Sequence, residues 1–183
     1  MSLSCTDHLI QEHRLILRAV FVVEAMAAQA RHFQLPDPTD VELLLDFLRR
    51  FADEHHQTKE ESILFPALRA AGTHQPPGAV RQMIFEHEQE RSLIQGLQDA
   101  LRTRNHGNFV YFGYRMADLL SSHIYKEDNI LFDLAEHAID GDTDTVLIEK
   151  MCDFDRTLAT GRYDSWVAMV NELERKYLKK VVA

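Results

Sequence analysis

Two segments of the sequence, 67 residues apart, carry the same potential metal ligands at the same spacing. One contains His56 and Glu60 and the other His123 and Glu127, and both read His-x-x-Lys-Glu-acid-x-Ile-Leu-Phe. On an α-helix, residues i and i+4 lie one turn apart on nearly the same side, so each His-Glu pair can bind one centre. This repeat predicts two similar helical hairpins that contribute equivalent ligands.

Two further histidines extend the set, because His13 and His87 each follow a glutamate and each project onto an apolar helical face. His123 and Glu127 also fall within an apolar stripe. In the other segment His55 and His56 both have apolar neighbours, and we prefer His56 because only it has a glutamate four residues later. The predicted metal ligands are His13, His56, Glu60, His87, His123 and Glu127.

Burying these groups together requires compensation, since an unpaired ionised carboxylate in a helical core costs several kcal/mol. Divalent or trivalent cations would supply that compensation. Four imidazoles and two carboxylates able to bridge, with no thiolate, fit a pair of non-haem iron ions. The alternative is a polar core without metal, satisfied by His-Glu hydrogen bonds.

Other polar residues have two interpretations each. Glu24 projects near the direction of His13 but three turns away, so it either supports the site or is a polar residue near the bundle end. Arg91 lies one turn from His87 on the predicted inward side, where it would pair with a carboxylate or bind an anion, or else reach solvent. We expect Glu61 and Asp128 to be charges on the outer face. The remaining histidines are expected to be exposed: His8, His32, His74, His106 and His137.

The elements that position these residues are helices, since only 7 Gly and 5 Pro interrupt the chain and they fall at widely spaced breaks. Thr6 is a candidate N-cap of the first helix, and Thr39 with Glu42 fits a capping box for the second. We predict an all-α protein: an up-down-up-down four-helix bundle with two additional C-terminal helices. The predicted helices span residues 7–33, 39–71, 77–104, 108–139, 143–160 and 163–179.

Composition limits the class of protein. At 183 residues the chain has the size of one domain, which we predict to span 1–183, with the bundle core at about 6–140 and a helical extension at about 142–183. The net charge of −9 disfavours nucleic acid and membranes as partners. Two cysteines, Cys5 and Cys152, are too few for a disulfide framework, and the first residues show no export signal, so we expect a cytoplasmic protein.

Taken together, the motifs resemble the hemerythrin-like, or HHE cation-binding, family of four-helix bundles. The resemblance covers about residues 6–140 and rests on Glu12-His13, His56 to Phe65, Glu86-His87 and His123 to Phe132. It implies a centre of two Fe ions, oxo- or hydroxo-bridged, with bridging carboxylates. Functions in the family range from oxygen binding and sensing to nitric oxide handling and iron-sulfur cluster repair.

One departure bears on the function. Oxygen-carrying hemerythrins have a second histidine one turn from the third-helix ligand, where this chain has Met83 and Arg91. The site is therefore more like the symmetric centres of the cluster-repair members. We favour a binding protein over an enzyme: a sensor, store or carrier of O2 or NO. The alternatives are a di-iron redox enzyme (nitric oxide or peroxide reduction, or cluster repair) and a structural or homeostatic metal-binding bundle.

Overall fold

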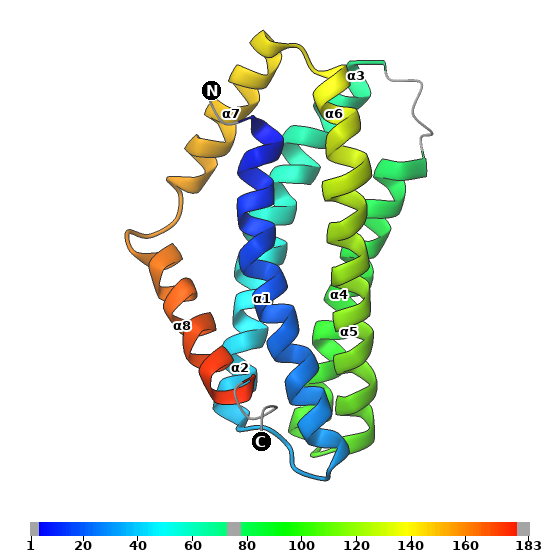
Figure 1. Ribbon diagram of the computed structural model, residues 1–183, viewed down its shortest axis with the longest axis vertical. Coiled ribbons are helices and arrows are strands. Elements are labelled where there is room, and N and C mark those ends of the chain that lie inside the picture. The colour runs from blue at the N-terminus through cyan, green and yellow to red at the C-terminus, as the bar shows by residue number, and fades with distance from the viewer. Residues whose placement is uncertain (1–3, 73–77, 179–183) are drawn as a thin grey trace.

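The computed structural model describes residues 4–72 and 78–178, and all regular secondary structure in these ranges is helical, which confirms the all-α prediction. Long helical stretches lie side by side and a pair of shorter helices flanks them (Figure 1). The first stretch is α1 (Cys5–Arg31). The second comprises α2 (Pro38–Phe47), η1 (Leu48–Gln57), η2 (Glu60–Leu64) and α3 (Phe65–Ala70); the third is α4 (Gly78–Arg102); the fourth comprises α5 (His106–Lys126), η3 (Glu127–Leu131) and α6 (Phe132–Ala138). The flanking pair is α7 (Gly141–Asp155) and α8 (Arg162–Tyr177).

The helix starts differ from the predicted ones by one or two residues. Ser4, not Thr6, caps α1, because its hydroxyl accepts from the Asp7 N–H while the Asp7 carboxylate accepts from the Ser4 N–H. Asp37 caps α2 and accepts from the Thr39 N–H, so the predicted capping box at Thr39 is wrong. Pro38 then fits the first turn, where a missing N–H costs nothing.

The second and fourth stretches contain π-helical turns, which the sequence analysis did not predict. η2 and η3 begin at Glu60 and Glu127 and end at Leu64 and Leu131, so they occupy the same positions in the two halves of the repeat. π-Helical turns insert a residue into the helix and are frequent at functional sites. Here each begins at a glutamate of the predicted ligand set.

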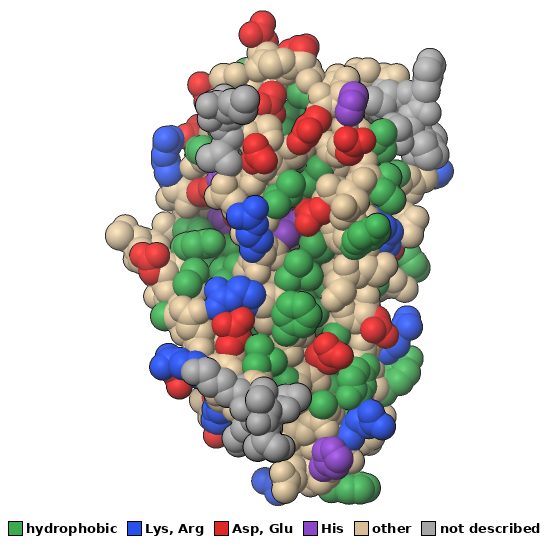
Figure 2. Space-filling model, viewed as in Figure 1, with side chains coloured by type: hydrophobic (Ala, Val, Ile, Leu, Met, Phe, Trp, Pro, Cys, Tyr) green, Lys and Arg blue, Asp and Glu red, His purple; other side chains and the backbone are tan. Residues whose placement is uncertain are grey.

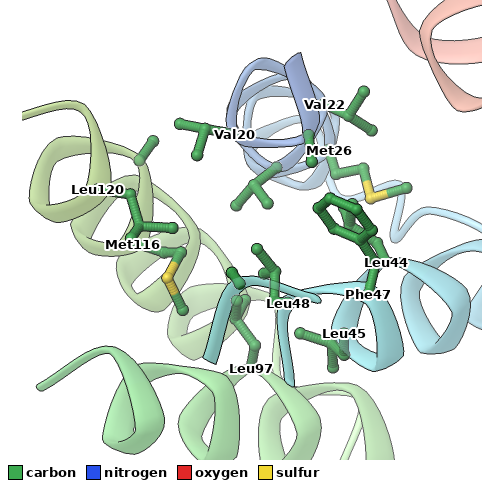
Figure 3. Close-up of a cluster of buried hydrophobic side chains, with 14 of the residues drawn as sticks. Val20, Val22, Met26, Leu44, Leu45, Phe47, Leu48, Leu97, Met116 and Leu120 are labelled. Atoms are coloured by element: carbon green, nitrogen blue, oxygen red, sulfur yellow. The ribbon is translucent and has the colours of Figure 1, made fainter. Parts of the chain in front are cut away.

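The apolar core is divided into two clusters of buried side chains. The larger one takes residues from α1, α2, η1, α4 and α5, as Figure 3 shows for Val20, Leu44, Leu48, Leu97 and Met116. The smaller one lies toward the start of α1 and includes Leu9, Phe65, Met83, Phe132 and Met151. His13 follows Leu9 of the smaller cluster and precedes Ile16 of the larger one, so the predicted ligand layer lies between two apolar regions.

Close helix contact and a docked extension complete the fold. At Gly113 on α5, a Cβ would lie 2.7 Å from the Cβ of Ala27, so glycine allows α5 to approach α1 closely. Trp166 of α8 packs against Phe47 and Phe51 with ring centroids at 6.4 and 5.1 Å. Trp166 therefore docks the final helix against the second helical stretch. Within the described residues, none of the helices is long and apolar enough to cross a membrane.

Candidate metal centre

All six predicted ligands are buried, and their ligand atoms converge in two groups that share both glutamates. One group is His13, His56, Glu60 and Glu127, and the other is Glu60, His87, His123 and Glu127; within each, the potential ligand atoms lie within 4.8 Å of one another. The residues come from four separate helical stretches. The structure therefore brings together every residue of the predicted set.

Glu60 and Glu127 lie between two histidine pairs, which are His13 with His56 and His87 with His123. Glu60 Oε1 is 3.5 Å from Nε2 of His56, and Glu60 Oε2 is 3.5 Å from Nε2 of His87. Glu127 Oε2 is 3.1 Å from Nε2 of His123 and 3.4 Å from Nε2 of His13. A carboxylate that faces both histidine pairs can bridge two metal ions.

Several of these buried atoms have no hydrogen-bond partner within the described part of the chain. They are Nε2 of His13 and His56 and both carboxylate oxygens of Glu60 and Glu127. Unsatisfied buried polar atoms are rare in native proteins, and so many in one layer require an explanation. Ligand atoms about 2.1 Å from a metal ion and at right angles lie about 3 Å apart, close to the separations seen here. The donor set and its spacing thus fit a pair of cations.

A second layer of carboxylates orients the four histidines. Each Nδ1 lies 2.6–2.9 Å from a carboxylate oxygen: His13 with Asp128, His56 with Glu12, His87 with Glu61, and His123 with Glu86. An Nδ1–H that donates to a carboxylate fixes the ring and leaves Nε2 directed at the centre. The expectation that Glu61 and Asp128 are only outer-face charges is therefore wrong.

These four contacts form a closed ring around the centre. The α1 carboxylate contacts the histidine of the second stretch, and the carboxylate of the second stretch contacts the histidine of α4. The α4 carboxylate contacts the histidine of α5, and the η3 carboxylate contacts the histidine of α1. Each helical stretch therefore supplies one orienting carboxylate and receives one. We call these four contacts the carboxylate ring.

Two phenylalanines at equivalent positions of the repeat cover the histidines. Phe132 stacks on His13 with ring centroids 5.5 Å apart, and Phe65 stacks on His87 at 6.2 Å. Both phenylalanines are fully buried in the smaller apolar cluster. These rings exclude water from one side of the centre, which strengthens its electrostatic interactions.

The electrostatics of the metal-free centre depend on protonated histidines. Burial disfavours the charged form of His56, but the carboxylates of Glu60 and Glu12 outweigh it and raise its pKa to about 10. The pKa values of the other three ligand histidines are also raised, because carboxylate partners outweigh their burial. Burial likewise opposes ionisation of Glu60, yet His56 and His87 hold its pKa well below the usual range. Imidazolium charge therefore balances the buried carboxylates when no metal is bound.

Two lysines at equivalent positions hold two of the orienting carboxylates. Lys59 donates to Oε1 of Glu12, and Lys126 donates to Oε1 of Glu86. Both lysines belong to the repeated segment, and each precedes one of the buried glutamates, Glu60 or Glu127, by one residue. Their identity in both copies was visible in the sequence, but their role required the fold.

The other polar residues considered in the sequence analysis have mixed outcomes. Arg91 does not point inward: its side chain is 42% exposed and its guanidinium pairs with Asp53 and Glu61. Glu24 is exposed. His8 is only 23% exposed and lies 2.9 Å from Asp155. His32 and His137 are exposed as predicted, His106 is half-buried, and His74 lies outside the described residues.

A further buried carboxyl went unnoticed in the sequence. Glu90, one turn after His87, is fully buried and accepts a hydrogen bond from the side-chain amide of Gln57. Burial raises the pKa of Glu90 to about 7. Its other oxygen has no partner among the described residues. No repeat or ligand spacing marks Glu90, so only the packing of α4 against η1 reveals it.

Comparison with protein families settles the resemblance. The sequence profile of the hemerythrin HHE cation-binding domain matches residues 5–135. The chain belongs to the hemerythrin HHE cation-binding family. Searches of curated proteins and of solved structures found no match. In this hemerythrin-domain protein the matched region contains all six predicted ligands and the carboxylate ring, whereas α7 and α8 lie beyond it.

Proposed function

We propose that this protein holds two iron ions, bridged by Glu60 and Glu127, and binds O2 or NO as a sensor, store or carrier. The supporting observation is a layer of buried atoms that have no hydrogen-bond partner among the described residues: Nε2 of His13 and His56 and the carboxylate oxygens of Glu60 and Glu127. Imidazole and carboxylate ligands suit iron, and neither ligand group contains a cysteine. When bound, the iron pair would supply positions for a small diatomic ligand, because six protein ligands do not fill two octahedral ions.

The chain's own residues account for the rest of the proposal. Glu60 and Glu127 would bridge, the four histidines would complete the set, and the carboxylate ring would fix their orientation. Phe65 and Phe132 keep the centre dry on one side. We propose that an up-down-up-down four-helix bundle, in one domain with α7 and α8, provides this frame.

The partner is proposed to be a small diatomic molecule and not a nucleic acid or a membrane. On the face shown in Figure 2, basic side chains are interspersed with acidic ones, so no continuous basic surface forms there. The net charge of −9 also disfavours polyanions. The cytoplasmic location stays a prediction.

A di-iron redox enzyme is the second candidate, and Glu90 is the observation that favours it. Reduction of nitric oxide or peroxide consumes protons. A buried carboxyl with a pKa near 7, one turn from a ligand histidine, can hold a proton at neutral pH. Binding and turnover therefore have to be separated by experiment.

The test begins with metal content. Protein produced with iron is expected to contain about two iron ions per chain, and His56→Ala and His123→Ala are each expected to lower that content. His137→Ala, a change at an exposed histidine on α6, is the matched control. A wild-type preparation without iron, or equal loading in all variants, would refute the proposed centre.

Gas exposure then separates the functions. The anaerobically reduced protein is mixed with O2 or with NO and followed by optical spectroscopy. An adduct that evacuation reverses supports binding. Continued consumption of the gas supports the enzyme, and the absence of any response supports a structural or homeostatic metal.

A further inference from the structure

The last residue of α7, Asp155, contacts polar residues that lie next to the metal centre. Asp155 Oδ1 lies 2.7 Å from the ammonium of Lys59, and Lys59 is fully buried. Asp155 also contacts His55 at 3.0 Å and His8 at 2.9 Å. Since the family profile ends at residue 135, this contact lies outside what the family match assigns.

Asp155 is connected to a ligand histidine through two intermediate residues. Lys59 donates to Oε1 of Glu12, and Oε2 of the same carboxylate lies 2.8 Å from Nδ1 of His56. Glu12 is buried, and its hydrogen bonds to His55 and His56 outweigh that burial and lower its pKa. Asp155, Lys59 and Glu12 thus form a continuous ionic chain that ends at the ring of His56.

The other half of the centre has the same inner part of this chain but not its outer end. Lys126 donates to Glu86, and Glu86 contacts Nδ1 of His123. Lys126, however, is 26% exposed, and among the described residues its one ion-pair partner is Glu86. The two histidine pairs are related by the sequence repeat, but only Lys59, beside His56, has an additional carboxylate partner from α7 among the described residues.

The cluster of His8, Glu12 and Asp155 has the spacing of a metal site. Yet the Lys59 ammonium donates to both carboxylates and lies 3.5 Å from Nε2 of His8. A cation is therefore already present at this position. We assign the cluster an orienting role and not a third metal ion.

We propose that Asp155 is a positioning residue that acts through Lys59 and Glu12 to fix His56, so that the metal position at His13 and His56 holds its ion more tightly than the position at His87 and His123. This inference rests on the proposed di-iron centre. Without Asp155, the ammonium of Lys59 would keep one carboxylate partner, Glu12, in place of two, and would hold Glu12 less firmly in position. His56 would then be a less well oriented and less basic ligand.

Metal release tests this inference. The full-length protein is loaded anaerobically with ferrous iron and mixed with a chromophoric ferrous chelator, and release is followed by absorbance. The wild type is expected to release iron in two phases of equal amplitude. Asp155→Asn is expected to accelerate the slow phase about 10-fold, the lower end of the effect typical of groups that orient metal ligands, and to leave the fast phase unchanged.

Two variants serve as controls and one as a mirror test. Asp153→Asn, at a 70% exposed position of α7 that pairs with Arg156, is expected to leave both phases unchanged. Asp155→Glu keeps the carboxylate and is expected to release iron at a rate closer to the wild type. Lys126→Met removes the equivalent cation of the other half and is expected to accelerate the fast phase alone.

The outcomes separate this inference from the proposed function. A wild type that holds no iron refutes the centre, and the inference fails with it. Release of two iron ions in a single phase would support the di-iron centre but would refute the difference in affinity between the two metal positions. Equal acceleration of both phases in Asp155→Asn, with a lowered Tm, would show that Asp155 stabilises the fold generally and would also overturn the positioning role.

Discussion

Metal loading of this protein is expected to release protons, and the structure limits the number. In the metal-free protein, carboxylate partners outweigh burial and raise the pKa values of all four ligand histidines above 6.5, that of His56 to about 10. Nε2 of His87 and Nε2 of His123 lie 3.2 Å apart, so one of them accepts a hydrogen bond and carries no proton. At most about three protons therefore have to leave Nε2 atoms when metal binds, and loading at pH 7 is expected to release at least about one, from His56, whose pKa is raised to about 10.

Calorimetric titration of the metal-free protein with ferrous iron, repeated in two buffers of different ionisation enthalpy, measures the protons released. The apparent affinity should also rise with pH between about 6 and 9, because protons compete with the metal for Nε2. His137→Ala, outside the centre, should give the same count. Release of less than about one proton per iron pair would show that His56 is already neutral and that imidazolium does not balance the buried carboxylates.

The same pKa shifts predict how the metal-free protein responds to pH. A histidine whose folded pKa is raised contributes stability that is complete below its unfolded pKa of about 6.5 and is lost as the pH rises through the folded pKa. For His56 this window extends to about 10. Chemical denaturation at pH 6.5 and 9.5 should therefore show a larger loss of stability for the metal-free protein than for the iron-loaded one.

Three further changes test individual residues. Arg91→His should add no metal ligand and leave iron content and spectra unchanged, because Arg91 is 42% exposed and pairs with Asp53 and Glu61; a new ligand band would contradict this placement. Glu90→Gln should stabilise the metal-free protein at pH 8 by up to roughly 3 kcal/mol and have little effect at pH 4.5, since a raised carboxyl pKa costs stability only above the unfolded pKa. Chemical denaturation at both pH values measures the change in unfolding free energy, and equal changes at the two pH values would refute the prediction. Gly113→Ala should lower the free energy of unfolding by about 1–3 kcal/mol through its clash with Ala27, whereas Gly107→Ala, with its nearest contact at 3.6 Å, should not destabilise.

The clustering of the six predicted ligands could be anticipated from the sequence because repetition and helical spacing act together. The constant offset between His56 with Glu60 and His123 with Glu127 pointed to two equivalent sites, and the structure brings these residues together with His13 and His87. The carboxylate ring was missed since its contacts join different helices. Spacing along one helix predicts which residues share a face, but it does not predict what lies across from them.

The second helical stretch shows why periodicity was ambiguous there. The sequence placed apolar neighbours around both His55 and His56, and both histidines are buried. His56 faces the centre, while His55 lies against Phe154 of α7 and contacts Asp155. A helix covered on two sides shows two apolar faces, and the π-helical turns shift their register further. For Arg91 the second of the two interpretations holds, because its long side chain leaves the inward side of the helix and reaches Asp53 near the surface.

The closed ring of carboxylate contacts also has a consequence for biosynthesis. His13 is the first of the four histidines to be synthesised, and its orienting carboxylate, Asp128, follows 115 residues later. At about 5–20 residues per second, translation leaves His13 without that partner for roughly 6–23 s. The ring has no segment that can close alone, so a nascent chain offers incoming iron only an open arc of ligands. We expect the ordered centre to acquire its metal after the fourth helical stretch has left the ribosome, and stalled chains that end before residue 128 to retain none.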